Sequence, residues 1–304
     1  MEQSKKIALL GSNGALGLAL ARALEESEFN ISFVDRSICD VQDGGALAKT
    51  LLDLQPSLVI NTAAFIRGVG ARDQMPYSVL AKNLQISLAV MEACRSSGIS
   101  RLLQFGSSQA RSGSPRYSTG DPSSAKERIG TTAYGLAKEV QTQAAHFSNF
   151  EFGTRFKEIQ LPNLFGPSDR FDLEMGHVVS SALLRVGQWL TNDEHEVSLP
   201  YQGEAERVFA YTPDVAKWIA QNIRDFDVWP DAFSLGVGEP STISEVYETA
   251  ARILGFEGHI NFEGVNEERA SCRSNPQLFL GRQRVPTTSL LQGMSVMARE
   301  RRAK

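Results

Sequence analysis

Short apolar segments alternate with longer amphipathic segments through the first two-thirds of this chain. Each short segment is typical of a buried strand and each longer one of a helix, a pattern that predicts a parallel sheet covered on both faces. The expected strands are KIALL, ISFV, LVINTAA and RLLQFGSS, followed in turn by helices at ALGLALARALEES, GALAKTLLDL, PYSVLAKNLQISLAVMEACRSSG and TTAYGLAKEVQTQAAHF. We therefore predict an α/β fold built on a doubly wound parallel sheet.

The regular alternation weakens after residue 160, where we expect a smaller mixed α/β region. A polar segment, 109–130, also separates a strand from a helix by far more than the usual few residues, which favours a functional loop. The elements expected in the last third are a helix over 174–190, strands around Val208 and Phe233, a helix after Pro213, and a helix that starts with a capping box from Thr242 to Glu245.

Composition excludes several classes of protein. The 304 residues carry 31 Lys and Arg against 35 Asp and Glu, a net charge of -4, which argues against nucleic acid as the main partner. No apolar run approaches the length of a membrane span, and the N-terminus does not resemble a signal peptide. Cys39, Cys94 and Cys272 fit neither a disulfide framework nor a zinc spacing. We expect a cytoplasmic protein with reduced thiols and no structural metal.

Three glycines, Gly11, Gly14 and Gly17, lie between the first expected strand and the first expected helix. A tight turn, a close backbone approach and a helix N-terminus coincide there, which is typical of the pyrophosphate cradle of a Rossmann-like fold. The alternative is a glycine-rich turn that binds nothing. The other residues of this turn that we assign to the cofactor are Asn13, Ala15 and Leu16.

The end of the second expected strand bears on the choice of cofactor. Asp35 can accept hydrogen bonds from the adenosine ribose and would repel a 2′-phosphate, whereas Arg36 would partly offset that repulsion. We therefore favour NAD(H) only slightly over NADP(H). Asp40, with Val41, is placed to reach the adenine, although an Asp in a loop is as often a turn former.

Tyr134 and Lys138 are four residues apart on an expected helix and therefore share a face. We expect the lysine ammonium to lower the pKa of the phenol from about 10 toward neutrality, which would make the tyrosine a usable proton donor or acceptor. Such a pair occurs by chance in many helices. Ser107 favours a catalytic interpretation because it ends a strand, at the edge where open parallel sheets bind ligands.

Four segments together resemble the extended short-chain dehydrogenase/reductase family: GSNGALG at 11–17, NTAA at 61–64, FGSS at 105–108 and YGLAK at 134–138. Within that family, the segment LPNLFGPSDRFDLEMGHVVSSALLR, at 161–185, is similar to the GDP-L-fucose synthase branch, which epimerises and reduces a GDP-linked 4-keto sugar. The resemblance covers about residues 5 to 225 and fades in the C-terminal 60 residues.

The resemblance implies roles for individual residues. Ser107, Tyr134 and Lys138 would form the catalytic triad, and Asn83 would be structural. Ala63 and Ala64 would line the cofactor site. The implied substrate contacts are Ser108, Gln109, Asn163, His177, Val178, Arg185 and Arg207. The two arginines would meet the nucleotide phosphates, since a guanidinium matches phosphate oxygens in a bidentate way, but each is also compatible with a solvated surface position.

Two departures from the family pattern carry consequences. The family holds the NADP 2′-phosphate with arginines, where this chain has Asn13 and the run Asp35, Arg36 and Ser37. The family also places a cysteine two residues after the catalytic serine for epimerisation, where this chain has Gln109. His177 aligns with the family's epimerisation histidine, so one acid/base group would be kept and the other lost.

We therefore expect residues 1–165, with 208–225 returning to them, to form a Rossmann domain that binds NAD(P). Residues 166–304 would mainly bind a sugar nucleotide. The leading function is a 4-keto-sugar reductase with absent or partial epimerase activity, and the alternatives are a full epimerase/reductase, a 4-epimerase or dehydratase that retains NAD, and a non-catalytic cofactor-binding scaffold or sensor. By resemblance, helices over 75–97 and 131–149 would pair across a homodimer axis.

Overall fold

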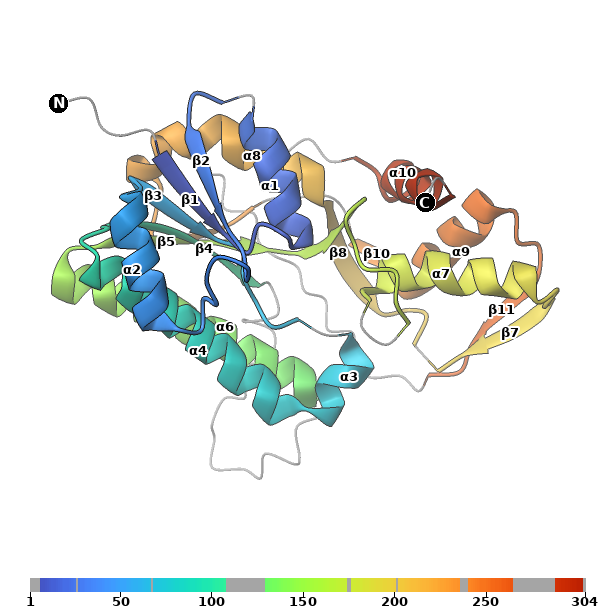
Figure 1. The fold of residues 1–304 in the computed structure, drawn as a ribbon. Coiled ribbons are helices and arrows are strands. Elements are labelled where there is room, and N and C mark those ends of the chain that lie inside the picture. The colour runs from blue at the N-terminus through green and yellow to red at the C-terminus, as the bar shows by residue number, and fades with distance from the viewer. Residues whose placement is uncertain are drawn as a thin grey trace.

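The computed structural model describes most of the chain, and helices cover both faces of a central sheet (Figure 1). The described residues are 6–25, 27–66, 68–107, 129–173, 176–200, 202–235, 240–264 and 288–302. Most of the polar segment expected at 109–130 therefore lies outside the described residues, as do Ser108, Gln109 and Cys272.

Six parallel strands form the main sheet in the order β2-β1-β3-β4-β5-β9. The order reverses at β1, so the chain first builds outward to one edge and then crosses back to build the other. Their bounds are β1 Lys6–Leu10, β2 Asn30–Val34, β3 Leu58–Asn61, β4 Arg101–Ser107, β5 Arg155–Leu161 and β9 Ala232–Ser234. The predicted doubly wound sheet is confirmed, including a strand at Phe233.

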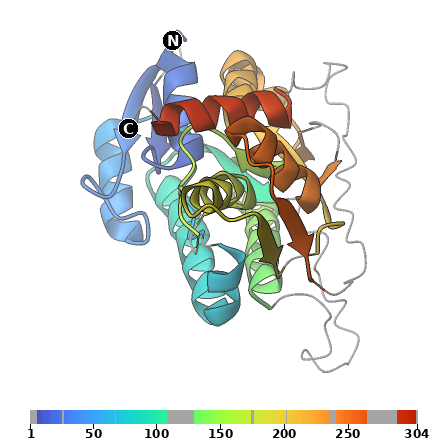
Figure 2. The same ribbon diagram turned by 90° about the vertical axis from the view of Figure 1, so that its right-hand side faces the viewer.

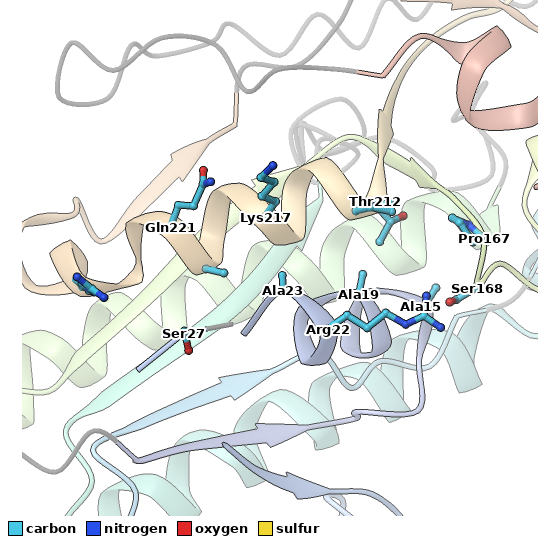
Figure 3. A pocket seen from close by; sticks show the side chains of 13 residues that line it. Ala15, Ala19, Arg22, Ala23, Ser27, Pro167, Ser168, Thr212, Lys217 and Gln221 are labelled. Atoms are coloured by element: carbon cyan, nitrogen blue, oxygen red, sulfur yellow. The ribbon is translucent and has the colours of Figure 1, made fainter. Parts of the chain in front are cut away.

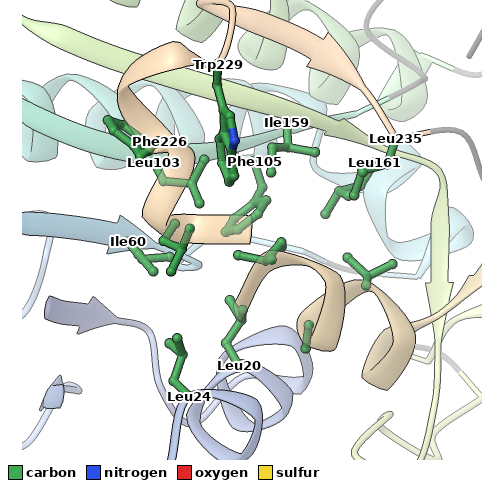
Figure 4. Close-up of a cluster of buried hydrophobic side chains, with 14 of the residues drawn as sticks. Leu20, Leu24, Ile60, Leu103, Phe105, Ile159, Leu161, Phe226, Trp229 and Leu235 are labelled. Atoms are coloured by element: carbon green, nitrogen blue, oxygen red, sulfur yellow. The ribbon is translucent and has the colours of Figure 1, made fainter. Parts of the chain in front are cut away.

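Alternate residues of each strand pack into different hydrophobic cores, as the two-residue period of a strand requires. Ile7 and Leu9 of β1 pack with α1 (Ala15–Glu25) and α8 (Thr212–Asn222), the core drawn in Figure 4. Ala8 and Leu10 pack on the opposite face, beneath α2 (Gly44–Leu54), α4 (Pro76–Ser96) and α6 (Ile129–Phe152). Burial on both faces explains why these strands are almost continuously apolar.

The last third of the chain builds a region with a hydrophobic core of its own beside the main sheet, named here the second core. Figure 2 turns this region toward the viewer. Trp189 stacks on Tyr247 with ring centroids 6.1 Å apart, joining two helices. The elements of this region are β6 Asn163–Phe165, α7 Val178–Thr191, β7 Glu196–Leu199, β8 Glu206–Tyr211, β10 Pro240–Thr242, α9 Ile243–Leu254, β11 His259–Phe262 and α10 Leu290–Arg302. The 3-10 helix Ile223–Val228 packs instead in the core of Figure 4, through Ile223 and Phe226. Strand β8 pairs with β6 and β10 in a separate sheet, while α8, which follows it directly, packs against α1.

One helix begins later than the sequence predicts. Instead of at about residue 174, α7 begins at Val178, because His177 is extended (φ -80°, ψ 162°) and Gly176 N–H donates to Asp172 O in a turn. The capping box of α9 is present as predicted. None of the described helices has both the length and the apolar character to cross a membrane.

Candidate active site

The glycine turn between β1 and α1 leaves no room for side chains. Gly11 has a left-handed φ of +74°, and a Cβ there would lie 2.7 Å from Ala63 N. A Cβ on Gly17 would lie 2.4 Å from Gly11 O, where the first turn of α1 passes over the loop. Only glycine fits either position. The turn therefore brings bare backbone to the N-terminus of α1, as a pyrophosphate cradle requires.

Asp35 connects this turn to the end of β2. Its Oδ2 accepts a hydrogen bond from Asn13 Nδ2 at 2.8 Å, and its Oδ1 accepts from the N–H and the hydroxyl of Ser37. The side-chain and backbone hydrogen bonds from Ser37 lower the pKa of Asp35 most, followed by the bond from Asn13. The carboxylate is thus ionised at neutral pH and held beside the glycine turn. Arg36 is exposed next to it.

Two further loops complete this side of the site. Asp40 caps a turn by accepting a hydrogen bond from Gln42 N–H, which lowers the pKa of Asp40, and Val41 packs partly into the core. Ala63 N–H donates to Asn61 Oδ1 just beyond β3, and Ala64 follows it. Asn83, on α4, holds the next residue of that loop through bonds with the N–H and C=O of Phe65, so its structural role is confirmed.

Ser107, Tyr134 and Lys138 lie at the carboxyl end of the main sheet. Ser107 is the last residue of β4, and Tyr134 and Lys138 lie one turn apart on α6. Lys138 Nζ donates to the backbone oxygen of Phe105 at 2.9 Å, which ties the lysine to β4 two residues before the serine. The helix therefore brings the pair to the strand end, as the sequence predicts.

The pKa expected for Tyr134 is wrong for this structure. Burial raises the pKa of Tyr134 to about 12, against a smaller lowering by the charge of Arg72 and with a further rise from Glu158. Protein surrounds the phenol closely even though part of its surface is exposed. Lys138 does not offset this, because its Nζ lies 6.0 Å from the centroid of the tyrosine ring and its hydrogen bonds go elsewhere.

Arg72 is a residue of this site that sequence reasoning did not find. It lies on α3 (Val69–Gln74), is only 7% exposed, and its guanidinium carbon is 5.7 Å from the centroid of the Tyr134 ring. Its charge lowers the pKa of both Tyr134 and His177, so all three side chains are within electrostatic range. No sequence motif contains Arg72. The signal that identifies it is its burial in a short helix, which only the structure shows.

His177 is the N-cap residue of α7 and keeps an exposed surface. The protein around it nevertheless lowers its pKa, with desolvation the larger cause and Arg72 the second. The imidazole is therefore mainly neutral at neutral pH.

The other expected substrate residues lie on the elements beside the strand ends. Asn163 begins β6, and its Nδ2 donates to Val208 O on β8 at 3.2 Å. Arg207, the neighbour of Val208, donates from Nη1 to Glu206 O at 2.7 Å. Val178 and Arg185 lie two turns apart on α7 and so share a face. Ser108 and Gln109 lie outside the described residues.

A cavity of about 610 Å³ lies elsewhere, along the outer sides of α1 and α8 (Figure 3). It is lined by Ala19, Arg22 and Lys217 among others, and by none of the three expected catalytic residues. Ala15, at the start of α1, is the one expected cofactor residue that borders it. We place the candidate active site at the strand ends because the glycine turn, the carboxylate of Asp35 and the buried ionisable groups meet there, which the cavity does not match.

The protein is similar to known proteins over nearly its whole length. The model of the NAD dependent epimerase/dehydratase family matches residues 7–236. The GDP-L-colitose synthase of Yersinia pseudotuberculosis is 26% identical over 261 residues, covering 83% of each chain. The GDP-L-fucose synthase of Sinorhizobium fredii (strain NBRC 101917 / NGR234) is 26% identical over 302 residues, covering 96% of this chain and 93% of the relative.

Solved structures share the fold. The GDP-mannoheptose C4 reductase of Campylobacter jejuni, with NADP bound, superposes with a TM-score of 0.78 at 21% identity and 99% coverage of both chains. The UDP-glucose 4-epimerase of Thermotoga maritima, with UDP-glucose, gives 0.76 at 20% identity, covering 98% of this chain and 99% of the other. These structures confirm the predicted Rossmann-like architecture.

Proposed function

The chain belongs to the NAD dependent epimerase/dehydratase family, and from this premise we propose that it reduces the C4 keto group of a nucleotide-linked 4-keto-6-deoxy sugar, with a GDP-sugar favoured. Family membership makes it an NAD(P)-dependent enzyme of the extended short-chain dehydrogenase/reductase type, as its motifs indicate. The observation that carries the proposal is the placement of Tyr134 and Lys138 of α6 against the end of β4, beside Ser107.

The choice of substrate class comes from the relatives. Two of them act on GDP-sugars by name, and a structural neighbour is described as a C4 reductase of a GDP-heptose. Arg185 and Arg207 are proposed to meet the diphosphate through their guanidinium groups, and Asn163, Val178, Ser108 and Gln109 to line the sugar-nucleotide pocket.

In the proposed reaction, C4 of the sugar would receive the hydride that a bound nicotinamide would supply. Tyr134 donates the proton to the C4 oxygen, and its high pKa keeps it protonated and ready to donate at neutral pH. Ser107 orients the carbonyl by a hydrogen bond. Lys138 holds the nicotinamide ribose, and Arg72 adds positive charge near the oxygen that becomes negative during the transfer.

The residues of the cradle fit NAD(H) better than NADP(H). Asp35 is ionised, and Asn13, which occupies a position of a phosphate-binding arginine in the resembled family, donates to that carboxylate. A 2′-phosphate would meet this negative charge, which the exposed Arg36 would offset in part. We therefore propose NAD(H) as the preferred cofactor, although the Campylobacter neighbour binds NADP.

We further propose that epimerisation is absent or limited to one centre. Inverting two carbons beside a keto group needs two groups that each give and take a proton near neutral pH. His177 provides one such group, but an amide has no accessible protonation equilibrium, so Gln109 cannot provide the other.

The decisive experiment incubates the purified enzyme with GDP-4-keto-6-deoxymannose and NADH or NADPH, and follows cofactor absorbance together with product mass. We expect the sugar to gain one hydrogen at C4 and one on the C4 oxygen, and no turnover with any nucleotide-linked 4-keto sugar would refute the proposal. A parallel incubation in D₂O without reduced cofactor tests epimerisation. Rapid deuterium entry at both C3 and C5 would instead indicate a full epimerase/reductase.

Tyr134→Phe tests the role of the phenol. Because the lost group is a proton donor rather than a binding contact, turnover should fall by about 10² to 10⁴ while the cofactor Kd stays within a few-fold. Near-normal kcat in this variant would exclude Tyr134 as the proton donor.

A further inference from the structure

A row of polar side chains crosses the buried face of the main sheet beneath the candidate active site. Asn61, Gln104 and Glu158 occupy paired positions on β3, β4 and β5, and each is at most 5% exposed. Phe156, two residues before Glu158 on the same strand, packs on the face covered by α4 and α6. Since residues two apart share a face, the carboxylate of Glu158 points toward α6.

Gln141 of α6 connects that carboxylate to Lys138. Lys138 Nζ donates to Gln141 Oε1 at 2.9 Å, and Gln141 Nε2 donates to Glu158 Oε2 at 2.8 Å. Ser87 of α4 also donates to Gln141 Oε1, so the amide is held with its oxygen toward the lysine and its nitrogen toward the carboxylate. Thr142 Oγ1 donates to the second carboxylate oxygen at 2.7 Å. The three bonds of Gln141 are buried, and the bond from Thr142 is partly buried.

The negative charge of Glu158 needs a cation to balance it inside the protein. Its neighbour Lys157 points to the opposite face and donates to the backbone oxygens of Asp227 and Trp229, so it does not balance the carboxylate. A buried charge is costly unless a partner compensates it. Lys138 is the cation that the network connects to Glu158.

Charged and neutral groups from four elements surround Lys138. Glu158 approaches from β5, Arg72 lies beyond Tyr134 on α3, and the contacts described from α4 and β4 are the neutral Ser87 and the backbone of Phe105. Burial lowers the pKa of Lys138 to about 8, and the charge of Glu158 raises it against that effect. Without Glu158, desolvation would favour the neutral amine.

We propose that Gln141 and Glu158 are positioning residues that keep Lys138 an ammonium ion and fix the direction of its Nζ. Phe105 O and Gln141 Oε1 take two of the three N–H donors of Lys138, which leaves one for the cofactor or for Tyr134. The catalytic consequence rests on the proposed function, whereas the charge of Lys138 can be measured without substrate or cofactor.

The first test follows the ¹³Cε chemical shift of Lys138 with pH in the cofactor-free protein, with the signal assigned by its loss in Lys138→Met. Glu158→Gln removes the charge and keeps the shape. Its Lys138 midpoint should fall by about one unit or more below that of the unsubstituted protein. Glu151→Gln is the matched control, because Glu151 is exposed on α6, the helix that carries Lys138. This variant should leave the Lys138 midpoint unchanged.

The second test is the pH dependence of kcat. Glu158→Gln should shift the alkaline limb to lower pH by the same amount as the Lys138 midpoint, so that activity is retained best in acid. A purely structural role would lower kcat by the same factor at every pH. Gln141→Leu, with the exposed Gln143→Leu as its control, makes the same measurements possible if Glu158→Gln does not fold.

An unchanged Lys138 midpoint in folded Glu158→Gln and Gln141→Leu would overturn this proposal. Absence of turnover in the unsubstituted protein would overturn the proposed function alone, because the NMR titration needs no substrate.

Discussion

At the scale of single residues, we propose that Asp35 selects between the two nicotinamide cofactors through its negative charge. Asp35→Asn removes the negative charge that opposes a 2′-phosphate, so the ratio of kcat/KM with NADPH to that with NADH should rise about tenfold, equivalent to roughly 1.4 kcal/mol. Asp53→Asn, which removes an exposed charge on α2, should leave the ratio unchanged. An unaltered ratio in Asp35→Asn would mean that another group selects the cofactor.

Arg72 contributes to the lowered pKa of His177, after desolvation. Desolvation and, to a smaller extent, the cation of Arg72 oppose protonation of His177, so Arg72→Gln should raise the pKa of His177 and extend the imidazolium form to higher pH. The ¹H shift of His177 Cε1, assigned by its loss in His177→Asn, measures the midpoint directly.

Arg170→Gln is the control for that measurement, because Arg170 is an exposed arginine in the segment before α7. An equal rise of the His177 pKa in both variants would show that any loss of positive charge has this effect. The nearby guanidinium of Arg72 would then have no special role.

At the scale of elements, α9 illustrates how local sequence stabilises the second core. Thr242 accepts a hydrogen bond from Glu245 N–H, and the Glu245 carboxylate accepts one from Thr242 N–H. Thr242→Ala leaves donors at the helix start without a partner and should lower the free energy of unfolding by about 1 kcal/mol, measured by urea denaturation.

Thr242→Ser keeps the accepting hydroxyl and should retain most of that stability. A loss as large in Thr242→Ser as in Thr242→Ala would contradict the capping explanation.

Helix α6 shows how one element serves several purposes. Its inward face carries Tyr134 and Lys138, which it places at the end of β4, and also Gln141, which it contributes to the buried network. Its outer face carries exposed apolar side chains, among them Phe147 and Phe150, at 62% and 90% exposed. The periodicity of the sequence identified the helix, but it did not show what each of these two faces contacts.

At the scale of the whole molecule, the outer faces of α4 and α6 form a candidate surface for dimerisation. Tyr77 and Leu88 of α4 and Phe147 of α6 are exposed large apolar side chains on adjacent helices. We propose that this surface pairs with a second copy of the chain. Light scattering after gel filtration should give twice the 33.3 kDa mass of the chain for the unsubstituted protein.

Phe147→Glu should shift that mass toward the monomer, because it places a charge in the proposed interface. Leu52→Glu, at a similarly exposed position on α2, should remain a dimer. A monomeric unsubstituted protein would exclude this interface.

The features that depend on residues close together in the chain could be predicted from the sequence alone. The apolar runs predicted the strands, the glycine spacing predicted the turn at Gly11, and the four-residue spacing placed Tyr134 and Lys138 on one helix face. Turn geometry and helical or strand periodicity are local properties, so a single sequence contains them.

The contacts that these residues make with distant parts of the chain are visible only in the tertiary structure. The strand order, the pairing of β8 outside the main sheet, Arg72 beside Tyr134, and the links from Lys138 through Gln141 to Glu158 join positions far apart in the chain. The pKa of Tyr134 was predicted with the wrong sign for the same reason. The spacing revealed a nearby lysine, whereas the desolvation that outweighs it comes from the packing of distant segments around the phenol.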